Sequence, residues 1–245
     1  MHRERKLAIS EIFYSIQGEG KTMGYPAVFL RLGGCNLMCG GMGTQTDKEL
    51  HNKAEWRCDT IEVWTKSITK PISEILDSKY KMELKRGAHL IITGGEPLMQ
   101  QTSLIPFIAL IKEETNCFIE IETNGTIIPK KELLELVDLF NCSPKTKNSG
   151  NEEDIRLKPK ALRAINEDSK DSIFKFVISN LYDYNEIITD FGNYISRDKV
   201  WLMPAGENQK LLNTNKELVA NICKEHNLKY TTRLHIEIWN QKTGV

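Results

Sequence analysis

The fold is decided by the segment PAVFLRLGGCNLMC, which occupies residues 26–39. It begins with an apolar, β-branched run at residues 28–32, which is typical of a strand buried on both faces. Glycines and polar residues follow at once, together with Cys35 and Cys39. The segment therefore predicts a buried strand that ends in a loop able to carry chemistry.

Six more apolar runs predict buried strands along the rest of the chain. Together with the first, the runs cover residues 28–32, 90–93, 118–122, 139–142, 174–178, 200–202 and 230–235. Between them, two apolar stripes recur with the periodicity of one helix face. The stripes are formed by Leu104, Phe107, Ile108 and Ile111, and by Leu218, Val219, Ile222 and Cys223. Strands that alternate with helices predict a parallel sheet.

Each cluster of unusual residues begins where a predicted strand ends. The clusters are GGCNLMC from residue 33, TGGEP from residue 93, ETNG from residue 122, SPK from residue 143 and MPAG from residue 203. Loops at the carboxyl ends of parallel strands converge, so these segments are expected to line one cavity. Six or seven strands are fewer than a full barrel needs. We therefore predict an α/β fold with a shortened or incomplete (β/α) barrel.

The composition is that of an ordinary globular domain, with 245 residues of which 40% are hydrophobic and 27% charged. Lys plus Arg and Asp plus Glu number 33 each, so no net charge favours nucleic acid or an anionic membrane. No apolar run approaches the ~20 residues that cross a bilayer, and no signal peptide precedes the first strand. We expect one cytoplasmic domain over residues 1–245, without a membrane partner or direct nucleic-acid contact.

Cys35, Cys39 and Cys58 are the strongest candidate metal ligands. Three residues separate the first pair, and eighteen residues separate Cys39 from Cys58. Three thiolates can hold three irons of a [4Fe–4S] cluster and leave the fourth iron open. His51 lies in the same loop, so a structural zinc site with three cysteines and one histidine is an equal alternative from spacing alone. The remaining cysteines, which lie in apolar runs, are expected to be buried core residues.

Seven motifs resemble, in the same order, the 7-carboxy-7-deazaguanine synthases, a family of radical S-adenosylmethionine (SAM) enzymes. The motifs are EIFYSIQGEG from residue 11, PAVFLRLGGCNLMC from 26, CDT from 58, TGGEP from 93, ETNG from 122, SPK from 143 and RLHIEIW from 233. TGGEP is shared by the wider radical SAM superfamily, whereas IFYSIQGEG followed by CDT and SPK is specific to the synthases. The resemblance spans nearly the whole chain and implies a barrel of the radical SAM type.

The resemblance implies a lyase that converts 6-carboxy-5,6,7,8-tetrahydropterin to 7-carboxy-7-deazaguanine with loss of ammonia, in 7-deazaguanine biosynthesis of the queuosine or archaeosine type. Its implied cofactors are a [4Fe–4S] cluster, SAM and Mg²⁺. In such enzymes the protein places the reactants and the cofactor supplies the radical chemistry. Implied partners are a flavodoxin or ferredoxin as electron donor and a second copy of the chain. The alternatives are another radical SAM enzyme, such as a glycyl-radical activase, and a non-catalytic zinc-binding protein.

The resemblance also implies roles for individual residues, none of which is an acid or base. The SAM side comprises Arg57, Cys58, Asp59, Gly94, Gly95, Ser143, Pro144, Lys145, Met203 and Pro204, and the substrate side Ile16, Gln17, Gly18, Arg31, Thr93, Glu122 and His235. Thr60 matches a hydroxyl that ligates Mg²⁺, a cation that prefers oxygen ligands. Arg31 is implied to pair bidentately with the substrate carboxylate. A structural ion pair of Arg31 with Glu11 or Glu19, and a core role for His235, are the alternatives.

Two features depart from the family pattern. Its members usually have two residues between the second and third cysteines, whereas this chain carries an insertion at about 40–57. The residue before the third cysteine is commonly aromatic and contacts the adenine of SAM, but here it is Arg57, with Trp56 one position earlier. Trp56 can stack on the base, and Arg57 can form a cation–π contact with it. The sequence leaves both possibilities open.

Overall fold

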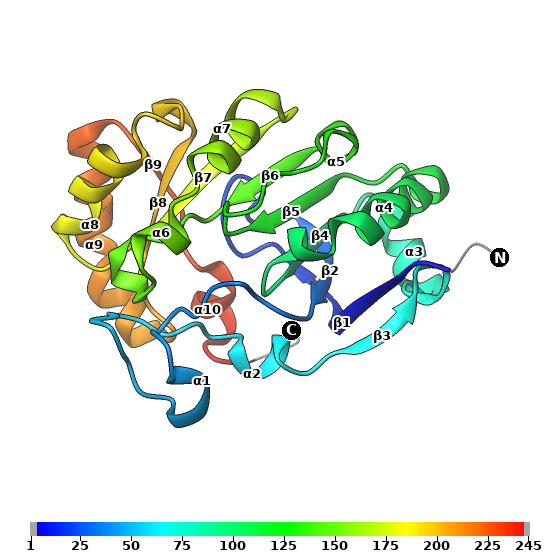
Figure 1. Cartoon of the computed structure of the whole chain (residues 1–245), viewed down its shortest axis with the longest axis horizontal. Coiled ribbons are helices and arrows are strands. Elements are labelled where there is room, and N and C mark those ends of the chain that lie inside the picture. Colours follow the sequence, from blue (N-terminus) through cyan, green and yellow to red (C-terminus); the bar gives the residue numbers. More distant parts are fainter. Residues whose placement is uncertain (1–3, 243–245) are drawn as a thin grey trace.

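One sheet of nine strands organises residues 4–242, the part of the chain that the computed structural model describes (Figure 1). The strands are β1 (Lys6–Ile16), β2 (Pro26–Leu32), β3 (Ile68–Pro71), β4 (His89–Gly94), β5 (Ile119–Thr123), β6 (Leu139–Cys142), β7 (Ser172–Ile178), β8 (Val200–Pro204) and β9 (Lys229–Tyr230). Their order across the sheet is β3-β1-β2-β4-β5-β6-β7-β8-β9. From β2 to β9 neighbouring strands run parallel, whereas β1 pairs antiparallel with β2 and β3. The sheet does not close, which confirms the prediction of an incomplete barrel.

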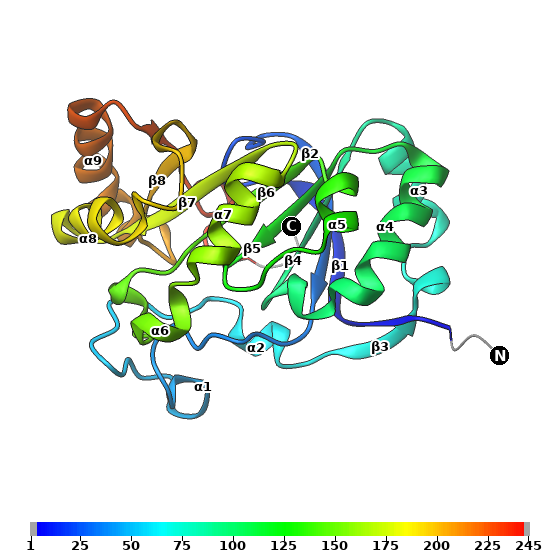
Figure 2. The same cartoon turned by 45° about the horizontal axis from the view of Figure 1, so that its top comes forward.

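Helices follow the strands, and several of them cover the outer face of the sheet (Figure 2). The α-helices are α1 (Thr44–Asp47), α2 (Ile61–Trp64), α3 (Ser78–Lys85), α4 (Gln101–Thr115), α5 (Lys131–Leu136), α6 (Glu153–Arg156), α7 (Pro159–Asp168), α8 (Leu181–Glu186), α9 (Gln209–His226) and α10 (Leu234–Trp239). Figure 2 shows α4, α5 and α7 side by side over the central strands. Within residues 4–242, none of the helices is both long and apolar enough to cross a membrane.

The core lies between this face of the sheet and the helices. Leu90 and Ile92 of β4 are fully buried in this core and Ile91 is fully buried in a second cluster, which explains why β4 is an almost uninterrupted apolar run. The predicted stripe on α4 is buried in the same cluster. Cys117, Cys142 and Cys223 are also buried there, as expected for small core residues.

The prediction of a strand at residues 230–235 is wrong for most of its length. Only Lys229–Tyr230 pairs with β8, and the chain then turns into α10, which begins at Leu234. Short apolar runs do not distinguish a strand from a helix, and here the tertiary contacts decide. The backbone N–H of Leu234 donates to the carbonyl of Gly18 at 2.9 Å, so α10 is drawn toward the end of β1. His235 therefore lies on a helix.

Two strands were not predicted from the sequence. β1 and β3 stand at the antiparallel end of the sheet, and their burial patterns are mixed, without the continuous apolar run of a central strand. A strand that is only partly covered needs no such run. Both strands extend the sheet beyond β2, and β1 leads into the QGEG segment at residues 17–20.

Candidate active site

A cleft of about 1000 Å³ opens at the carboxyl ends of the parallel strands. It brings together every residue that the sequence assigned to the cluster, SAM, Mg²⁺ or substrate, with the exception of Pro144. Those residues are Ile16, Gln17, Gly18, Arg31, Cys35, Cys39, Arg57, Cys58, Asp59, Thr60, Thr93, Gly94, Gly95, Glu122, Ser143, Lys145, Met203, Pro204 and His235. They come from segments along most of the chain, which is the convergence expected of loops at one end of a parallel sheet.

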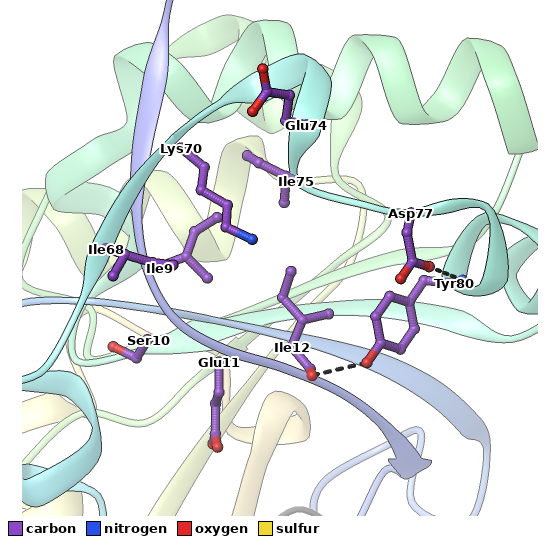
Figure 3. Close-up of a pocket in the computed structure, with 10 residues that line it drawn as sticks. All are labelled: Ile9, Ser10, Glu11, Ile12, Ile68, Lys70, Glu74, Ile75, Asp77 and Tyr80. Carbon is purple, nitrogen blue, oxygen red and sulfur yellow. Dashed lines mark hydrogen bonds between the residues drawn. The ribbon is translucent and has the colours of Figure 1, made fainter.

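A smaller pocket of about 290 Å³ lies between β1, β3 and α3. Figure 3 shows the Lys70 ammonium group pointing into it, and the hydroxyl of Tyr80 donating to the carbonyl of Ile12. Glu11 is common to both pockets, but none of the residues that the sequence assigned to the site lines the smaller one. The large cleft is therefore the candidate site.

The three predicted cluster ligands line this cleft as free thiols. The backbone N–H of Cys58 donates to the carbonyl of Cys39 at 3.1 Å, so the distant third cysteine returns beside the second. Burial raises the pKa of Cys35 to about 11 and that of Cys39 to about 12. Such thiols become thiolates when a metal centre supplies positive charge. The donor set therefore fits a cluster held by three cysteines.

The alternative zinc site is not assembled. The Nε2 atom of His51 pairs with the Asp47 carboxylate at 2.9 Å, and His51 is not among the residues that line the cleft. Among residues 4–242 no three His, Cys, Asp or Glu side chains converge as the ligands of one ion. A cubane cluster does not need such convergence, because each cysteine binds a different iron.

Replacing His51 with alanine is therefore expected to leave the iron content unchanged. The substitution removes the pairing with Asp47 and no cluster ligand. Iron and acid-labile sulfide, measured after anaerobic purification, check this expectation, with Asp47→Ala as the matched control for loss of the same pair. Loss of bound metal in His51→Ala but not in Asp47→Ala would restore the zinc model.

The insertion folds back onto the segment that follows the SPK motif. The N–H of Gly40 donates to the carbonyl of Ser149 at 2.9 Å, and the N–H of Glu55 donates to the carbonyl of Asn148 at 2.8 Å. Asn148 and Ser149 are buried beneath it. The neighbouring Asn151 donates to the Cys39 sulfur at 3.6 Å. The insertion is thus anchored beside the cluster ligands and packs closely against the sheet domain.

The structure separates the two candidates for the adenine contact. The Arg57 guanidinium is held by Thr44, which accepts at 3.1 Å, and by Glu62, which accepts at 2.6 Å. Trp56 lines the cleft, and the Lys145 ammonium lies 5.8 Å from the centre of its ring. The Trp56 indole N–H donates to Asn148 at 2.8 Å, which fixes the ring. Arg57 lines the cleft as well, so the two residues differ in that the Arg57 guanidinium is engaged by Thr44 and Glu62.

Gly94 and Gly95 allow the TGGEP loop to touch the cysteine loop. A Cβ atom on Gly95 would lie 2.0 Å from the carbonyl oxygen of Gly34, and one on Gly94 would lie 2.3 Å from that of Leu32. Gly94 also has a φ of 142°, which side chains rarely adopt. Glycine is therefore required at both positions, because the TGGEP backbone lies directly against the backbone of residues 32–34.

A row of polar side chains crosses the sheet on the cleft side, and we call it the polar row. Its members are Glu11, Arg31, Thr93, Glu122 and Asn141 on β1, β2, β4, β5 and β6. Strand register pairs Glu11 with Arg31, Arg31 with Thr93, and Glu122 with Asn141. The Thr93 hydroxyl donates to Glu122 at 2.8 Å, so the row continues from β4 to β5. All five residues line the cleft.

The sequence left two roles open for Arg31, a structural ion pair and a contact with the substrate carboxylate. The structure shows an ion pair with Glu11. The Nε atom donates to Glu11 at 2.7 Å. Among residues 4–242, no hydrogen bond or ion pair involves the two terminal nitrogens of Arg31. They face a cleft that can hold an anionic ligand, so the ion pair and a substrate contact are compatible.

Glu120, which the sequence analysis missed, is buried beneath the polar row. It is fully buried and accepts from the side-chain amides of Gln17 at 3.0 Å and Asn141 at 2.8 Å, and from the hydroxyl of Thr22. Burial, followed by the charge of Glu122, raises the pKa of Glu120 to about 7. The sequence pattern that could have identified Glu120 is the alternation IEIET at residues 119–123. In a strand this alternation places the carboxyl groups of Glu120 and Glu122 on the same face.

A network of charges that the sequence did not predict joins Asp59 to Glu19, Lys175 and Arg233 at the C-terminal side of the cleft. Glu19 pairs with Lys175 and with Arg233, and Arg233 also pairs with Asp59. Although burial alone would raise the pKa of Glu19, the two cations hold it well below its ordinary value. The network joins the segment after β1 to α10 and to the residue that follows Cys58. Such pairing across distant segments leaves no local pattern in the sequence.

His235 lies against the backbone of Gly18. A Cβ atom on Gly18 would lie only 2.2 Å from His235 Nδ1, so the contact requires glycine. Burial lowers the pKa of His235, which favours the neutral ring. The imidazole therefore borders the cleft as a neutral hydrogen-bonding group.

Comparisons with known proteins show what the chain is similar to. Residues 16–166 match the model of the 4Fe-4S single cluster domain. The 7-carboxy-7-deazaguanine synthase of Halobacterium salinarum is 32% identical and is aligned over 96% of this chain and 91% of its own length. That of Pyrobaculum aerophilum is 30% identical over 98% and 97% of the two chains. The crystal structure of QueE from Escherichia coli is similar in fold, with a TM-score of 0.64, 22% identity, and coverage of 94% and 95%.

Proposed function

Because the chain belongs to the family of 7-carboxy-7-deazaguanine synthases, radical SAM lyases with a [4Fe–4S] cluster, we propose that its cleft converts 6-carboxy-5,6,7,8-tetrahydropterin to 7-carboxy-7-deazaguanine with loss of ammonia. One observation carries this proposal. The thiols of Cys35, Cys39 and Cys58 share a single cleft with the polar row. When bound, the reduced cluster supplies the electron that cleaves SAM. The chain's own residues hold the reactants in place beside it.

The SAM subsite is proposed to lie between the cluster cysteines and the loops after β4, β6 and β8. Gly94 and Gly95 offer backbone groups there without side chains in the way. Lys145 donates to both oxygens of Ser143 at 2.9 Å, which holds the SPK loop in position. The Asp59 side chain forms an ion pair with Arg233, which holds its loop in place. We therefore assign the contact with SAM to the backbone of Asp59. Met203 and Pro204 also line the cleft, and we assign them to the SAM subsite.

We expect Trp56→Ala to raise the KM for SAM by about tenfold, because stacking of a base on an aromatic ring contributes roughly 1–3 kcal/mol. Trp56→Phe keeps an aromatic face and is expected to retain most of the affinity. Steady-state SAM cleavage at varied SAM concentration measures the effect. A larger increase in KM for Arg57→Gln than for Trp56→Ala would assign the adenine contact to Arg57 instead.

The pterin is proposed to lie along the polar row. Glu122 accepts from its guanidine-like edge, and the terminal nitrogens of Arg31 pair with its carboxylate. Thr93 donates to Glu122 and so orients that carboxylate. The backbone of residues 16–18 and the ring of His235 border the same space.

Thr60 is proposed as a ligand of Mg²⁺. It lines the cleft directly before α2, and its hydroxyl lies 3.4 Å from the sulfur of Cys58. A cation at this hydroxyl would lie where the substrate carboxylate and the cluster loop meet. Oxygen ligands of this kind suit Mg²⁺, which keeps several of its waters.

Anaerobic incubation with carboxytetrahydropterin, SAM, a reductant and Mg²⁺ tests the function. The expected result is 7-carboxy-7-deazaguanine, identified by mass spectrometry, from a protein with about four irons per chain. SAM cleavage without deazaguanine would indicate another radical SAM reaction, such as activation of a glycyl-radical enzyme. Bound zinc in place of iron would indicate the non-catalytic alternative.

The wider properties expected from the sequence are part of the same proposal. We propose a single domain over residues 1–245, with residues 40–57 as an insertion in the cluster loop. The hydrogen bonds that tie Gly40 and Glu55 to residues 148–149 support this assignment. A homodimer, a flavodoxin or ferredoxin as electron donor, and a cytoplasmic location are proposed from family membership. Sedimentation and reduction by purified flavodoxin test the first two.

A further inference from the structure

We propose that Asn141 determines substrate specificity, because its side-chain amide oxygen accepts a hydrogen bond from the 2-amino group on the guanidine-like edge of the bound pterin. The inference rests on the proposed function and names a contact within the same cleft. It concerns a residue for which the motifs of the sequence assign no role.

Strand register places Asn141 next to the proposed substrate ligand. Glu122 on β5 and Asn141 on β6 are direct partners in the parallel ladder. Partners in a ladder project their side chains to the same face of the sheet. Both residues line the cleft, so the amide and the carboxylate face the same part of it.

The amide nitrogen of Asn141 is held by Glu120. It donates to Glu120 at 2.8 Å, and Glu120 also accepts from Gln17 and Thr22. A carboxylate surrounded by donors fixes which end of the amide faces it. With the amide nitrogen donating to Glu120, the amide oxygen of Asn141 faces away from that residue.

This oxygen is buried and has no hydrogen-bond partner among residues 4–242. Buried polar atoms without partners are rare in native proteins, and each one calls for an explanation. Asn141 is fully buried yet belongs to the wall of the cleft. A ligand in the cleft is the group that can supply the missing donor.

The position is built for an amide. A Cβ atom on Gly20 would lie 2.7 Å from the Asn141 nitrogen, and Gly20 has a φ of 78°. Only glycine accommodates both the backbone conformation and the neighbouring amide without displacement. The segment after β1 thus leaves room for the Asn141 amide group beside it.

Two acceptors side by side select a particular ligand edge. The Glu122 carboxylate and the Asn141 oxygen match an amino group next to a ring N–H, which is the donor pattern of a pterin. A carbonyl in place of the amino group would bring an acceptor against an acceptor. Sites built around a specific hydrogen bond strongly reject analogues that cannot make it.

Binding of the product and of its analogue without the 2-amino group tests the proposal. The probes are 7-carboxy-7-deazaguanine and the corresponding des-amino compound, titrated calorimetrically into cluster-loaded enzyme with SAM. Wild type is expected to prefer the amino compound by tenfold or more. In Asn141→Ala the amino compound is expected to bind about tenfold more weakly, while the des-amino compound changes less than threefold.

Ile173→Val is the matched control, because Ile173 is the register partner of Asn141 on β7 and has no polar atom. It is expected to preserve the preference for the amino group. Iron content and SAM cleavage without pterin report whether each variant is folded, and Asn141→Leu replaces the alanine variant if that protein fails to fold. An equal loss for both ligands in the Asn141 variant, or no preference in wild type, would overturn the proposal. Wild type that cleaves SAM but binds neither probe would instead overturn the proposed function.

Discussion

Replacing Cys35, Cys39 or Cys58 with alanine is expected to remove the iron–sulfur cluster and to abolish SAM cleavage. The three thiols line one cleft, and each is expected to bind a different iron. Two cysteines leave a second iron without a protein ligand. Iron and sulfide content, together with the visible absorption of the anaerobically purified protein, measure the loss directly.

Cys117→Ala and Cys223→Ala are the controls for this series. Both cysteines are buried in the hydrophobic core and neither lines the cleft. We expect full iron content in both variants, with at most a modest loss of stability from the smaller side chain. A full complement of iron in Cys58→Ala would refute the assignment of the third ligand.

Replacing Thr60 with valine is expected to lower turnover of the pterin by ~10²-fold or more, while the cluster and reductive SAM cleavage remain. Valine has the shape of threonine but lacks the oxygen that we propose as a ligand of Mg²⁺. A substrate that is no longer held in the reactive geometry loses the advantage of orientation. Formation of deazaguanine, measured against Mg²⁺ concentration, is expected to rise in wild type and scarcely in the variant.

Thr65→Val is the matched control for this prediction. Thr65 lies at the other end of α2, where its hydroxyl donates to the carbonyl of Ile61, and it does not line the cleft. The control is expected to respond to Mg²⁺ as wild type does. An identical Mg²⁺ response in Thr60→Val and wild type would exclude Thr60 from the metal site.

The parallel part of the sheet and the location of the site were predictable from sequence. Buried strands of a parallel sheet are rich in apolar side chains, so β2 and β4 to β8 appear as mainly apolar runs, although Arg31, Glu120, Glu122, Asn141 and Lys175 interrupt four of them. The chemistry follows each run directly, because functional loops extend from the carboxyl ends of these strands. Local sequence therefore contains the information for both features.

The ends of the sheet were not predictable in the same way. β1 and β3 are only partly buried, and their mixed pattern does not distinguish them from loops. The segment at residues 230–235 (YTTRLH) has a mixed pattern that does not fix either kind of element, and its last two residues begin α10, where the N–H of Leu234 donates to the carbonyl of Gly18. At these positions long-range contacts outweigh local preference.

The partners within the site were decided only by the tertiary structure. Trp56 and Arg57 are neighbours in sequence and both line the cleft, yet Thr44 and Glu62 hold the Arg57 guanidinium while Asn148 holds the Trp56 indole. Glu120 and Asn141 meet because β5 and β6 pair in one register, and a shift of one residue would point Asn141 to the other face. The amino-acid pattern determines which residues can form strands and bind a cluster. Strand register and burial decide which side chains meet, because both depend on contacts between residues far apart in the chain.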